Sequence, residues 1–352
     1  MTIVGARPQF VKAAPVSRIL RQDNNEFLLH TGQHYDDEMS DLFFRQLQIP
    51  TPDLNLEVGS GRHGAQTGAM LAGIEEAALD YKPDWVLIYG DTNSTLAGAI
   101  VAAKLHVPVA HVEAGLRSYD RRMPEEINRV VADHVSTLLL CPTDVAVGNL
   151  AREGVTQGVL MVGDVMYDAF RQNLAIARQS SRILEESKLE PGGYQLLTVH
   201  RAENVDQPDL LRAILSGVTE SGRLVVFPVH PRTRAQFAKT GIEPGANVLV
   251  IDPVGYLEML VLEENAEAIV TDSGGVQKEA YFAGKPCITL RDRTEWTETV
   301  QAGWNVLVGT DKQAIAEAMC NFRPKGERPE LFGDGHAAER VVEALSGHHA
   351  IT

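Results

Sequence analysis

Acidic and basic side chains crowd into one short stretch, residues 111–129, which reads HVEAGLRSYDRRMPEEINR. Glu113 comes directly after the apolar run VPVAHV, and Glu125 follows twelve residues later beside Glu126, with four arginines in the same stretch. Carboxylates held at fixed places can remove a proton from a substrate and return one to it. The stretch therefore predicts acid–base chemistry, with its arginines placed to orient the carboxylates or a substrate.

Other apolar runs also end in groups that can do chemistry. The run WVLIYG leads into Asp91, and TIV leads into Arg7. In the second half of the chain, QLLTV leads into His200 and Arg201, and LVVFPV leads into His230. Ligands bind beyond the carboxyl ends of the strands in an open parallel sheet. Loops are polar in any protein, but arginines, acids and histidines gathered at these strand ends favour a ligand site.

The stretch TDSGGVQKEA, residues 271–280, has the pattern of a strand, a turn of small residues and the start of a helix. Free backbone N–H groups at a helix start, together with the helix dipole, suit a phosphate, and Gly274 and Gly275 let it approach closely. Glu279, one turn later, could accept hydrogen bonds from ribose hydroxyls, as an acid does in dinucleotide-binding folds. Taken alone, the stretch fits equally well an ordinary turn in which Ser273 caps the helix.

Two further patterns would suggest a cofactor, and both fail on their context. The stretch GSGRHG, residues 59–64, matches G-x-G-x-x-G, but that fingerprint belongs in the first βα turn of a βαβ unit. Here it follows DLNLEV well inside the chain, so we interpret it as a flexible loop. His111 and Glu113 are spaced like two metal ligands, but no third ligand has suitable spacing. We expect no cofactor and no metal.

Composition limits the class of protein. A chain of 352 residues is long for one hydrophobic core and sufficient for two domains. Its formal net charge of −15, without a basic tract, argues against a nucleic-acid partner. Its three cysteines are widely spaced, which suits a reducing compartment rather than a disulfide framework. With no signal-peptide pattern and no apolar run near ~18 residues, we expect a cytoplasmic protein with no membrane partner.

Short runs rich in Val, Ile and Leu alternate with helical patterns along the chain. The runs are continuously apolar, which is typical of strands buried on both faces of a parallel sheet. The order predicts an α/β fold of two Rossmann-like, doubly wound domains facing a cleft. A poorly apolar helical segment near residues 166–190 marks the passage between them. We expect an N-terminal domain at 1–167, a C-terminal domain at 168–335 and a last helix within 336–352 that packs back on the N-terminal domain.

A series of motifs occurs in the order known from one enzyme family, over nearly the whole chain: GARPQFVKAAP, YGDTNSTLAG, HVEAGLRS, MPEEINR, VHRAEN, PVHPRT, DPVGYLEM, TDSGGVQKEA and LRDRTEW. On these motifs, the chain resembles the non-hydrolysing UDP-N-acetylglucosamine 2-epimerases. The resemblance implies a glycosyltransferase-B-like fold, a homodimer, and a place in the sugar-nucleotide metabolism of the cytoplasm that serves polysaccharide biosynthesis.

The resemblance also implies roles for the residues that match the family motifs. Asp91, Glu113 and Glu125 would surround the sugar as acid–base candidates, and His200 would lie beside the diphosphate. The implied substrate-binding residues are Arg7, Lys12, Arg201, His230, Ser273, Gly274, Gly275, Glu279 and Arg291. For Glu126, Arg117 and Arg129, ion-pair or orienting roles are favoured over proton transfer.

The implied reaction inverts C2 of an N-acetylhexosamine, converting UDP-N-acetylglucosamine to UDP-N-acetylmannosamine. The C2 proton is barely acidic because no carbonyl flanks it. If the C1–O bond to UDP breaks, positive charge at C1 acidifies that proton, and the sugar passes through a glycal before UDP is added back. Such a reaction needs a phosphate cradle for the departing UDP and acid–base groups near both faces of the ring.

One departure from the family pattern concerns the substrate. The family usually carries T-E-R-P-E, whereas residues 294–298 read TEWTE here. Together with GARPQF, RMPEEINR and GGVQKEA, this resembles the branch that acts on UDP-2,3-diacetamido-2,3-dideoxyglucuronate. In that branch Arg121 or Arg122 would pair with the C6 carboxylate, and Trp296 would contribute to substrate choice. The alternative is that both arginines are solvated loop residues.

Some bacterial members of the family also bind UDP-N-acetylglucosamine at a second, activating position. The resemblance places Gln33, His34 and Arg62 there, although GSGRHG departs from the pattern of that site. Two other functions stay open at this point, a glycosyltransferase of the same fold and a UDP-sugar sensor without turnover. The number of carboxylates on the sugar side argues against the transferase.

Overall fold

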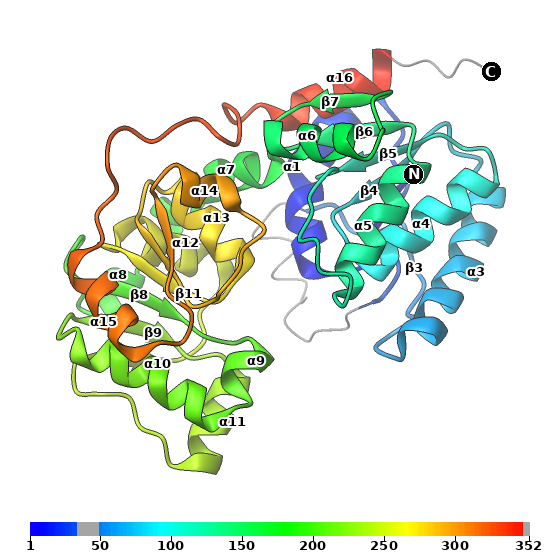
Figure 1. Cartoon of the computed structure of the whole chain (residues 1–352). Coiled ribbons are helices and arrows are strands. Elements are labelled where there is room, and N and C mark those ends of the chain that lie inside the picture. The colour runs from blue at the N-terminus through cyan, green and yellow to red at the C-terminus, as the bar shows by residue number, and fades with distance from the viewer. Residues whose placement is uncertain (34–48, 348–352) are drawn as a thin grey trace. The chain divides into compact units, whose positions relative to one another are not determined.

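The computed structural model of the chain describes residues 1–33 and 49–347. The chain divides into two compact units, one made of Met1–Ala169 with Phe332–Thr352 and the other of Phe170–Leu331. Each unit has its own sheet, and helices surround each sheet (Figure 1).

The first unit is built around a seven-stranded sheet in which all neighbouring strands are parallel. Its strands are β1 (Thr2–Val4), β2 (Leu28–His30), β3 (Leu54–Asn55), β4 (Val86–Tyr89), β5 (Val109–Val112), β6 (Leu138–Cys141) and β7 (Val159–Met161). Their order across the sheet is β3-β2-β1-β4-β5-β6-β7. The inner strands β1, β2, β4, β5 and β6 are buried along their whole length, as their apolar runs predict.

The helices of the first unit pack their apolar faces on this sheet. They are α1 (Arg7–Asp23), α3 (His63–Tyr81), α4 (Asn93–Lys104), α5 (Pro124–Val135), α6 (Asp144–Arg152), the start of α7 (Val165–Ser180) and α16 (Ala337–Gly347). Helix α4 packs between α3 and α5, and α16 returns from the end of the chain to pack against α1 (Figure 1). Ile3, Ile74 and Ile88 are fully buried in the core that results.

The second unit repeats the plan with six parallel strands in the order β10-β9-β8-β11-β12-β13. Its strands are β8 (Gln195–Thr198), β9 (Val225–Pro228), β10 (Val248–Ile251), β11 (Ile269–Thr271), β12 (Cys287–Thr289) and β13 (Asn305–Leu307). Its helices, after the end of α7, are α8 (Ile183–Glu186), α9 (Ala202–Val205), α10 (Pro208–Glu220), α11 (Pro231–Thr240), α12 (Tyr256–Asn265), α13 (Gly274–Phe282), α14 (Thr297–Gln301) and α15 (Lys312–Asn321). Leu197, Phe227 and Val270 are fully buried in its core.

Each sheet has one point at which the strand order reverses direction. In the first sheet it lies between β1 and β4, and in the second between β8 and β11. The loops that leave neighbouring strands there run to opposite faces of the sheet, which opens a crevice at the carboxyl ends of the strands. The loop after β4 carries Asp91, and the loops after β8 and β11 carry His200 and Ser273. The topology therefore places predicted site residues where ligands bind in such folds.

The predicted α/β fold with two doubly wound parallel sheets is confirmed. Two strands, β2 and β3, were not predicted. Strand β2 has only three residues, and β3 is a two-residue, exposed edge strand with no continuous apolar run. Short edge strands are half solvated and give little hydrophobic signal. The stretch GSGRHG forms a loop that runs into the first turn of α3, and not the first βα turn of a nucleotide-binding unit.

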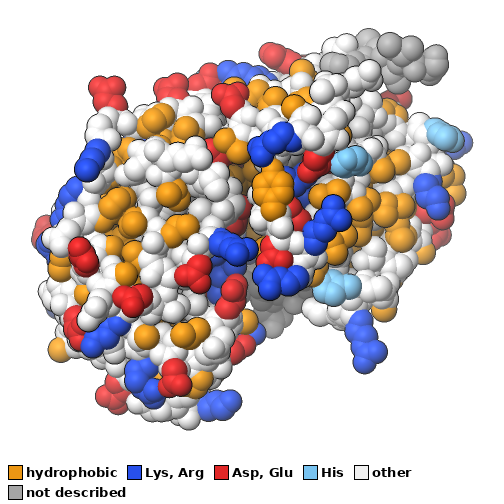
Figure 2. Space-filling model, viewed as in Figure 1, with side chains coloured by type: hydrophobic (Ala, Val, Ile, Leu, Met, Phe, Trp, Pro, Cys, Tyr) orange, Lys and Arg blue, Asp and Glu red, His pale blue; other side chains and the backbone are white. Residues whose placement is uncertain are grey.

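The surface of both units is mixed in charge. On the face in Figure 2, acidic and basic side chains are interspersed, and exposed apolar side chains lie between them. Among the residues that the structure describes, no helix combines the length and the apolar character needed to cross a membrane.

Candidate active site

The turn between β1 and α1 is held by the side chain of Gln9. Its amide oxygen accepts from the backbone N–H groups of Gly5 and Ala6 at 2.8 and 3.1 Å. Its amide nitrogen donates to the carbonyl of Tyr89 at 2.7 Å and to the hydroxyl of Thr95 at 3.1 Å. The buried amide of Gln9 thus connects the loop after β1 to the segment around the loop after β4. Both its oxygen and its nitrogen make two hydrogen bonds, which fixes the two loops.

Glu113 lies at the carboxyl end of β5 in a backbone conformation that L-residues rarely adopt. Its φ is +69°, and only 7% of the residue is exposed. Its carboxylate forms an ion pair with Lys12 of α1. A Cβ on Gly90, after β4, would lie 3.3 Å from that carboxylate and 3.4 Å from the Lys12 ammonium. Glycine at position 90 therefore leaves space for the pair, and the backbone of Glu113 is held in a conformation that is costly for a residue with a side chain.

Asp91 is held by an arginine from α5. Arg129 donates two hydrogen bonds to one Asp91 carboxylate oxygen, at 2.6 and 3.0 Å, and a third to Glu126 at 2.8 Å. Asn128 of the same helix donates to the backbone carbonyl of Asp91 at 2.9 Å. Helix α5 thus fixes both the side chain and the backbone of Asp91. The favoured ion-pair roles of Arg129 and Glu126 agree with these contacts.

Glu125 and Glu126 are neighbours with different environments. Both lie in the first turn of α5, which begins at Pro124 and where the helix dipole favours acids. Glu126 is buried and accepts from the backbone N–H groups of Ser118 and Tyr119 at 2.9 and 2.8 Å. Glu125 is exposed. Glu126 therefore organises the loop before α5, while Glu125 is accessible to a substrate.

The arginines of that loop point to solvent. Arg121 is exposed, and the Arg122 side chain is 85% exposed and paired with Asp120 at 2.6 Å. An exposed pair within one loop is worth little to stability. Arg122 is thus available to a second anion.

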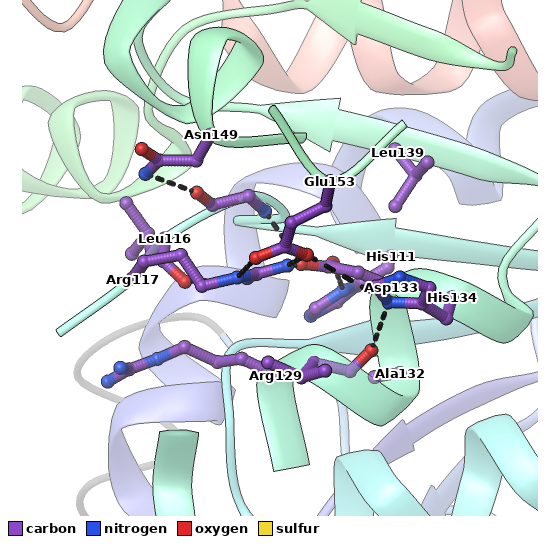
Figure 3. A network of polar contacts seen from close by, with 12 residues as sticks. His111, Leu116, Arg117, Arg129, Ala132, Asp133, His134, Leu139, Asn149 and Glu153 are labelled. Carbon is purple, nitrogen blue, oxygen red and sulfur yellow. Dashed lines mark hydrogen bonds and ion pairs between the residues drawn. The ribbon is translucent and has the colours of Figure 1, made fainter. Parts of the chain in front are cut away.

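A network of charged and polar side chains lies behind the loop after β5, with His111, Arg117 and Asp133 buried and Glu153 exposed (Figure 3). His111 Nδ1 contacts Asp133 Oδ1 at 2.7 Å. The other Asp133 oxygen accepts from Arg117 at 2.7 Å, and Arg117 forms a two-pronged pair with Glu153 at 2.7 and 2.8 Å. Burial opposes the ionisation of Asp133, but the hydrogen bonds and charges of His111 and Arg117 outweigh it and lower the pKa of this carboxyl.

In the second unit, the switch point is organised by Asp272. This fully buried carboxylate accepts from the backbone N–H groups of His200 and Arg201 at 3.2 and 3.0 Å and from the Asn204 side chain at 3.1 Å. It follows β11, whereas its three partners follow β8. The acid therefore joins the two loops that flank the switch point.

His200 faces a set of cationic neighbours. Its ring lies 5.7 Å from the ring of His230, centroid to centroid, and its Nδ1 lies 3.6 Å from Asp272. Burial, together with the charges of His230, Arg201 and Arg232, lowers the pKa of His200 despite the attraction of Asp272. These surroundings favour the neutral imidazole over the charged one. His230 is exposed and accepts from the backbone N–H of Arg232 at 3.2 Å at the start of α11.

The start of α13 has the form predicted for TDSGG. Ser273 caps the helix and accepts from the backbone N–H of Val276 at 3.4 Å. Gly275 is exposed, and a Cβ there would meet only the Ser273 hydroxyl, at 3.8 Å. A Cβ on Gly274 would clash with Glu295, which is itself paired with Arg291 at 3.0 Å. The capping arrangement and the open glycine are both present, so the two interpretations of this turn do not exclude each other.

Behind the start of α13 lie two buried acids and a buried tryptophan. Glu279 is in contact with Glu263 of α12, which is fully buried. Burial, and then the charge and hydrogen bond of Glu279, raise the pKa of Glu263 well above its usual range. Trp296 is 4% exposed, with the ammonium of Lys278 4.2 Å from the centroid of its ring. Trp296 thus lies in the protein interior rather than on an open surface.

Gln66 connects the two described residues that are named for an activating site: its backbone N–H donates to the carbonyl of Arg62 at 2.9 Å, and its side chain donates to the carbonyl of Gln33 at 3.2 Å. Gln33 is buried, and its side chain accepts from the backbone N–H and hydroxyl of Ser94 at 3.0 and 2.7 Å. Arg62 is exposed immediately before α3. His34 lies outside the described residues. Arg7 is half-buried at the first position of α1.

Several residues that organise the site have no role predicted from the sequence, although three of the four lie within the quoted motifs. Gln9, Asn128, Asp133 and Asp272 each bond to a segment far away in the sequence. A polar residue in an apolar segment signals burial with a partner, but the sequence does not say which partner. In the described part of the chain, no group of three or more His, Cys, Asp or Glu side chains is placed to hold a metal ion.

Known proteins match the chain over nearly its full length. The model of the UDP-N-acetylglucosamine 2-epimerase family matches residues 18–346. A UDP-N-acetylglucosamine 2-epimerase homolog of Methanococcus maripaludis is 53% identical and covers 98% of both chains. The UDP-2,3-diacetamido-2,3-dideoxy-D-glucuronate 2-epimerase of Pseudomonas aeruginosa is 48% identical and covers 98% of this chain and 99% of its own.

Solved structures agree. The Methanocaldococcus jannaschii UDP-GlcNAc 2-epimerase, crystallised with UDP-GlcNAc and UDP, is 45% identical, covers 98% of this chain and 99% of its own, and has a TM-score of 0.88. A glycosyltransferase from Streptomyces nogalater reaches a TM-score of 0.53 at 15% identity, which shows the fold alone and confirms the glycosyltransferase-like architecture. On its family match and on these identities, the chain belongs to the UDP-N-acetylglucosamine 2-epimerase family.

Proposed function

We propose that this protein is a non-hydrolysing UDP-N-acetylglucosamine 2-epimerase, which inverts C2 of the sugar through elimination and re-addition of UDP. The observation that carries the proposal is the grouping of Glu113 and Asp91 at the ends of two paired strands. Each is fixed by a cation, Lys12 for Glu113 and Arg129 for Asp91. A sugar-nucleotide transferase has no need for two fixed carboxylates beside the sugar.

In the elimination step, a carboxylate takes the C2 proton. The C2–H electron pair forms the C1=C2 double bond, and the C1–O bond breaks with its electrons on the β-phosphate of UDP. The products are a glycal, UDP and a protonated carboxyl group. Asp91, Glu113 and Glu125 are the candidates for this base, and the ion pairs of the first two hold their carboxylates at fixed places.

The return step runs the same bonds in reverse on the other face of the ring. A second carboxyl group delivers a proton to C2 from the opposite face while the UDP oxygen attacks C1. Because the proton leaves from one face and arrives on the other, the configuration at C2 inverts. At the end of the cycle the first carboxyl group holds a proton and the second has lost one, which is the state that the reverse reaction needs. Atoms and electrons therefore balance without an oxidant or a metal.

The second unit offers the groups that a departing diphosphate needs. Open backbone N–H groups at the start of α13 and the exposed Gly275 suit a phosphate. A neutral imidazole at His200 can donate a hydrogen bond, Arg201 adds positive charge, and the ring of His230 lies beside that of His200. Glu279, which is in contact with the buried Glu263, is proposed as the acceptor for the ribose hydroxyls. A nucleotide sugar carries both a diphosphate and a sugar, and so matches the residue sets of both units.

The alternative substrate is UDP-2,3-diacetamido-2,3-dideoxyglucuronate, on which the Pseudomonas aeruginosa relative acts. An exposed, solvent-facing Arg122 suits the C6 carboxylate of that sugar. Incubating the protein with each substrate and following C2 by NMR separates the two, since only a true substrate gives the manno epimer. Arg122→Ala should weaken only the turnover of the uronate, and equal effects on both sugars would remove Arg122 from substrate choice.

Assembly, location and regulation belong to the same proposal. We propose a homodimer that works in the cytoplasm, as the resemblance to the family implies. The activating role of UDP-N-acetylglucosamine at Gln33, His34 and Arg62 predicts sigmoidal rates. A change at Arg62, which is exposed, should abolish the sigmoidal shape and leave saturation of the active site intact.

A further inference from the structure

We propose that His111 is a positioning residue for the epimerase reaction, whose doubly donating ring fixes the backbone between Asp91 and Glu113. The inference rests on the proposed roles of these two carboxylates. His111 itself is fully buried in β5 and touches neither solvent nor any open surface.

Both ring nitrogens of His111 face acceptors. Nδ1 lies 2.7 Å from the Asp133 carboxylate, and Nε2 lies 2.7 Å from the backbone carbonyl of Gly90. A carbonyl oxygen only accepts. Asp133 also only accepts, because its other oxygen already receives hydrogen bonds from Arg117 and from the backbone N–H of Gly115, at 2.7 and 3.1 Å. A neutral ring would direct a lone pair at one of these oxygens, so the ring donates from both nitrogens.

The surrounding charges balance such a cation. Asp133 and Glu153 are the acids of the network, and His111 and Arg117 are its bases (Figure 3). Of the three buried members, Asp133 lies at hydrogen-bond distance from both His111 and Arg117, and Glu153 pairs with Arg117 from the exposed end. A well-packed apolar cluster would serve stability at least as well as buried ion pairs do. The charges found here therefore favour a role in fixing the positions of neighbouring groups.

That geometry concerns Gly90, which directly precedes Asp91. Its N–H donates to the carbonyl of Val112 at 3.0 Å, and its own carbonyl accepts from His111. Two consecutive residues of β5, His111 and Val112, thus bond to the carbonyl and the N–H of Gly90. Glu113 is the next residue after this pair, and Asp91 is the next residue after Gly90. The orientation of one carboxylate is thereby tied to that of the other.

The backbone at this junction needs such a constraint. Gly90 has a φ of +62° and Glu113 a φ of +69°, and the second is costly for a residue with a side chain. Without the bond from the ring, the Gly90 carbonyl loses a hydrogen-bond partner, and the peptide between Gly90 and Asp91 can shift within the limits set by the bonds of Val112 and Asn128. A shift of about 1 Å at a reacting group is enough to cost ~10²-fold in rate.

Two amide variants separate positioning from stability. In His111→Gln, the amide nitrogen lies near the place of Nε2 and keeps the bond to the Gly90 carbonyl. In His111→Asn, the amide nitrogen lies near the place of Nδ1 and keeps the bond to Asp133. The Asn variant protects the buried carboxylate and should be the more stable of the two. If His111 serves stability alone, the more stable Asn variant should also be the more active one. If His111 positions the Gly90 carbonyl, the less stable Gln variant should be the more active one.

We expect kcat to fall about 100-fold or more in His111→Asn and about 10-fold in His111→Gln, with KM and UDP binding within about 3-fold of wild type. The control is His134→Gln, an exposed histidine at the end of the same network, which should leave kcat unchanged. An Asn variant as active as the Gln variant, or more so, would overturn the proposal. So would an equal loss in the control.

Nitrogen-15 NMR of the wild-type protein tests the ring directly, even if both variants fail to fold. We expect His111 to show an attached proton on each ring nitrogen, as the two acceptors that face them require. A bare Nε2 would overturn the proposal. Wild-type turnover is measured first, so that failure of the epimerase reaction itself is seen separately from failure of His111 in it.

Discussion

Asp91 and Glu113 show how much of this site depends on partners that lie far away in the sequence. Glu113 pairs with Lys12 of α1, and Asp91 pairs with Arg129 of α5. The motifs identify Asp91 and Glu113 as candidates, because an acid at the end of an apolar run does not contribute to the hydrophobic core and so suggests a binding or catalytic role. They do not indicate how each is oriented, since the orienting cation comes from another helix.

Replacing either carboxylate with its amide tests the assigned roles. We expect Asp91→Asn and Glu113→Gln each to lower kcat by about 10²- to 10⁴-fold, because an amide keeps the shape but cannot take up a proton. The measurement is initial-rate epimerisation by NMR. UDP binding by calorimetry is the control and should stay within a few-fold of wild type, because the residues proposed to bind the diphosphate belong to the second unit. Near-normal turnover in one variant would remove that residue from the acid–base set.

At the scale of elements, the start of α13 carries the most specific prediction. Gly275 lies in the first turn of this helix, and a Cβ there would meet nothing closer than 3.8 Å. Gly275→Ala should therefore leave the free protein folded and raise its stability by up to about 1 kcal/mol, because alanine favours the helix. A methyl group at an open helix start would keep a phosphate away. We expect UDP to bind at least ~10-fold more weakly.

Gly148 of α6 offers the matched control, because a Cβ there also meets nothing within 4 Å. Gly148→Ala should give a similar gain in thermal stability with unchanged affinity for UDP. If both variants bind UDP as the wild type does, the diphosphate does not approach the start of α13.

The same scale shows what the sequence can predict of the fold. Buried strands such as β4 and β6 are continuous apolar runs and are recognised directly, as is the capped start of α13. Strands β2 and β3 are too short or too exposed to give such a signal. The order of strands, and with it the two switch points, follows from right-handed crossovers and not from any local pattern. The site residues were found because strand ends meet at those points.

At the scale of the molecule, Asp168 of α7 fastens the end of the chain to the first unit. Its carboxylate accepts from the backbone N–H of Ala338 in α16 at 2.7 Å, while its other oxygen is buried. Burial, with added repulsion from Glu339 and Asp164, raises the pKa of Asp168 to about 6. No motif predicts this contact, because its partners are far apart in the sequence.

A raised pKa in the folded state gives stability that is present below about pH 4 and is lost as the pH rises through about 6. Asp168→Asn keeps an acceptor for Ala338 and has no charge to bury. We therefore expect the variant to gain in melting temperature over wild type as the pH rises from 4 to 8, by an amount that corresponds to at most about 3 kcal/mol. A difference in melting temperature that is the same at pH 4 and pH 8 would contradict this account of Asp168.

The central claim is that this protein breaks and remakes the C2–H bond of a UDP-sugar. The most direct measurement is NMR at C2 while the protein acts on UDP-N-acetylglucosamine in heavy water. The account predicts deuterium at C2 together with the appearance of UDP-N-acetylmannosamine, because the proton taken from one face is replaced from solvent-exchanged carboxyl groups on the other. A C2 position that stays fully protonated, in this sugar and in the diacetamido-uronate, would contradict it.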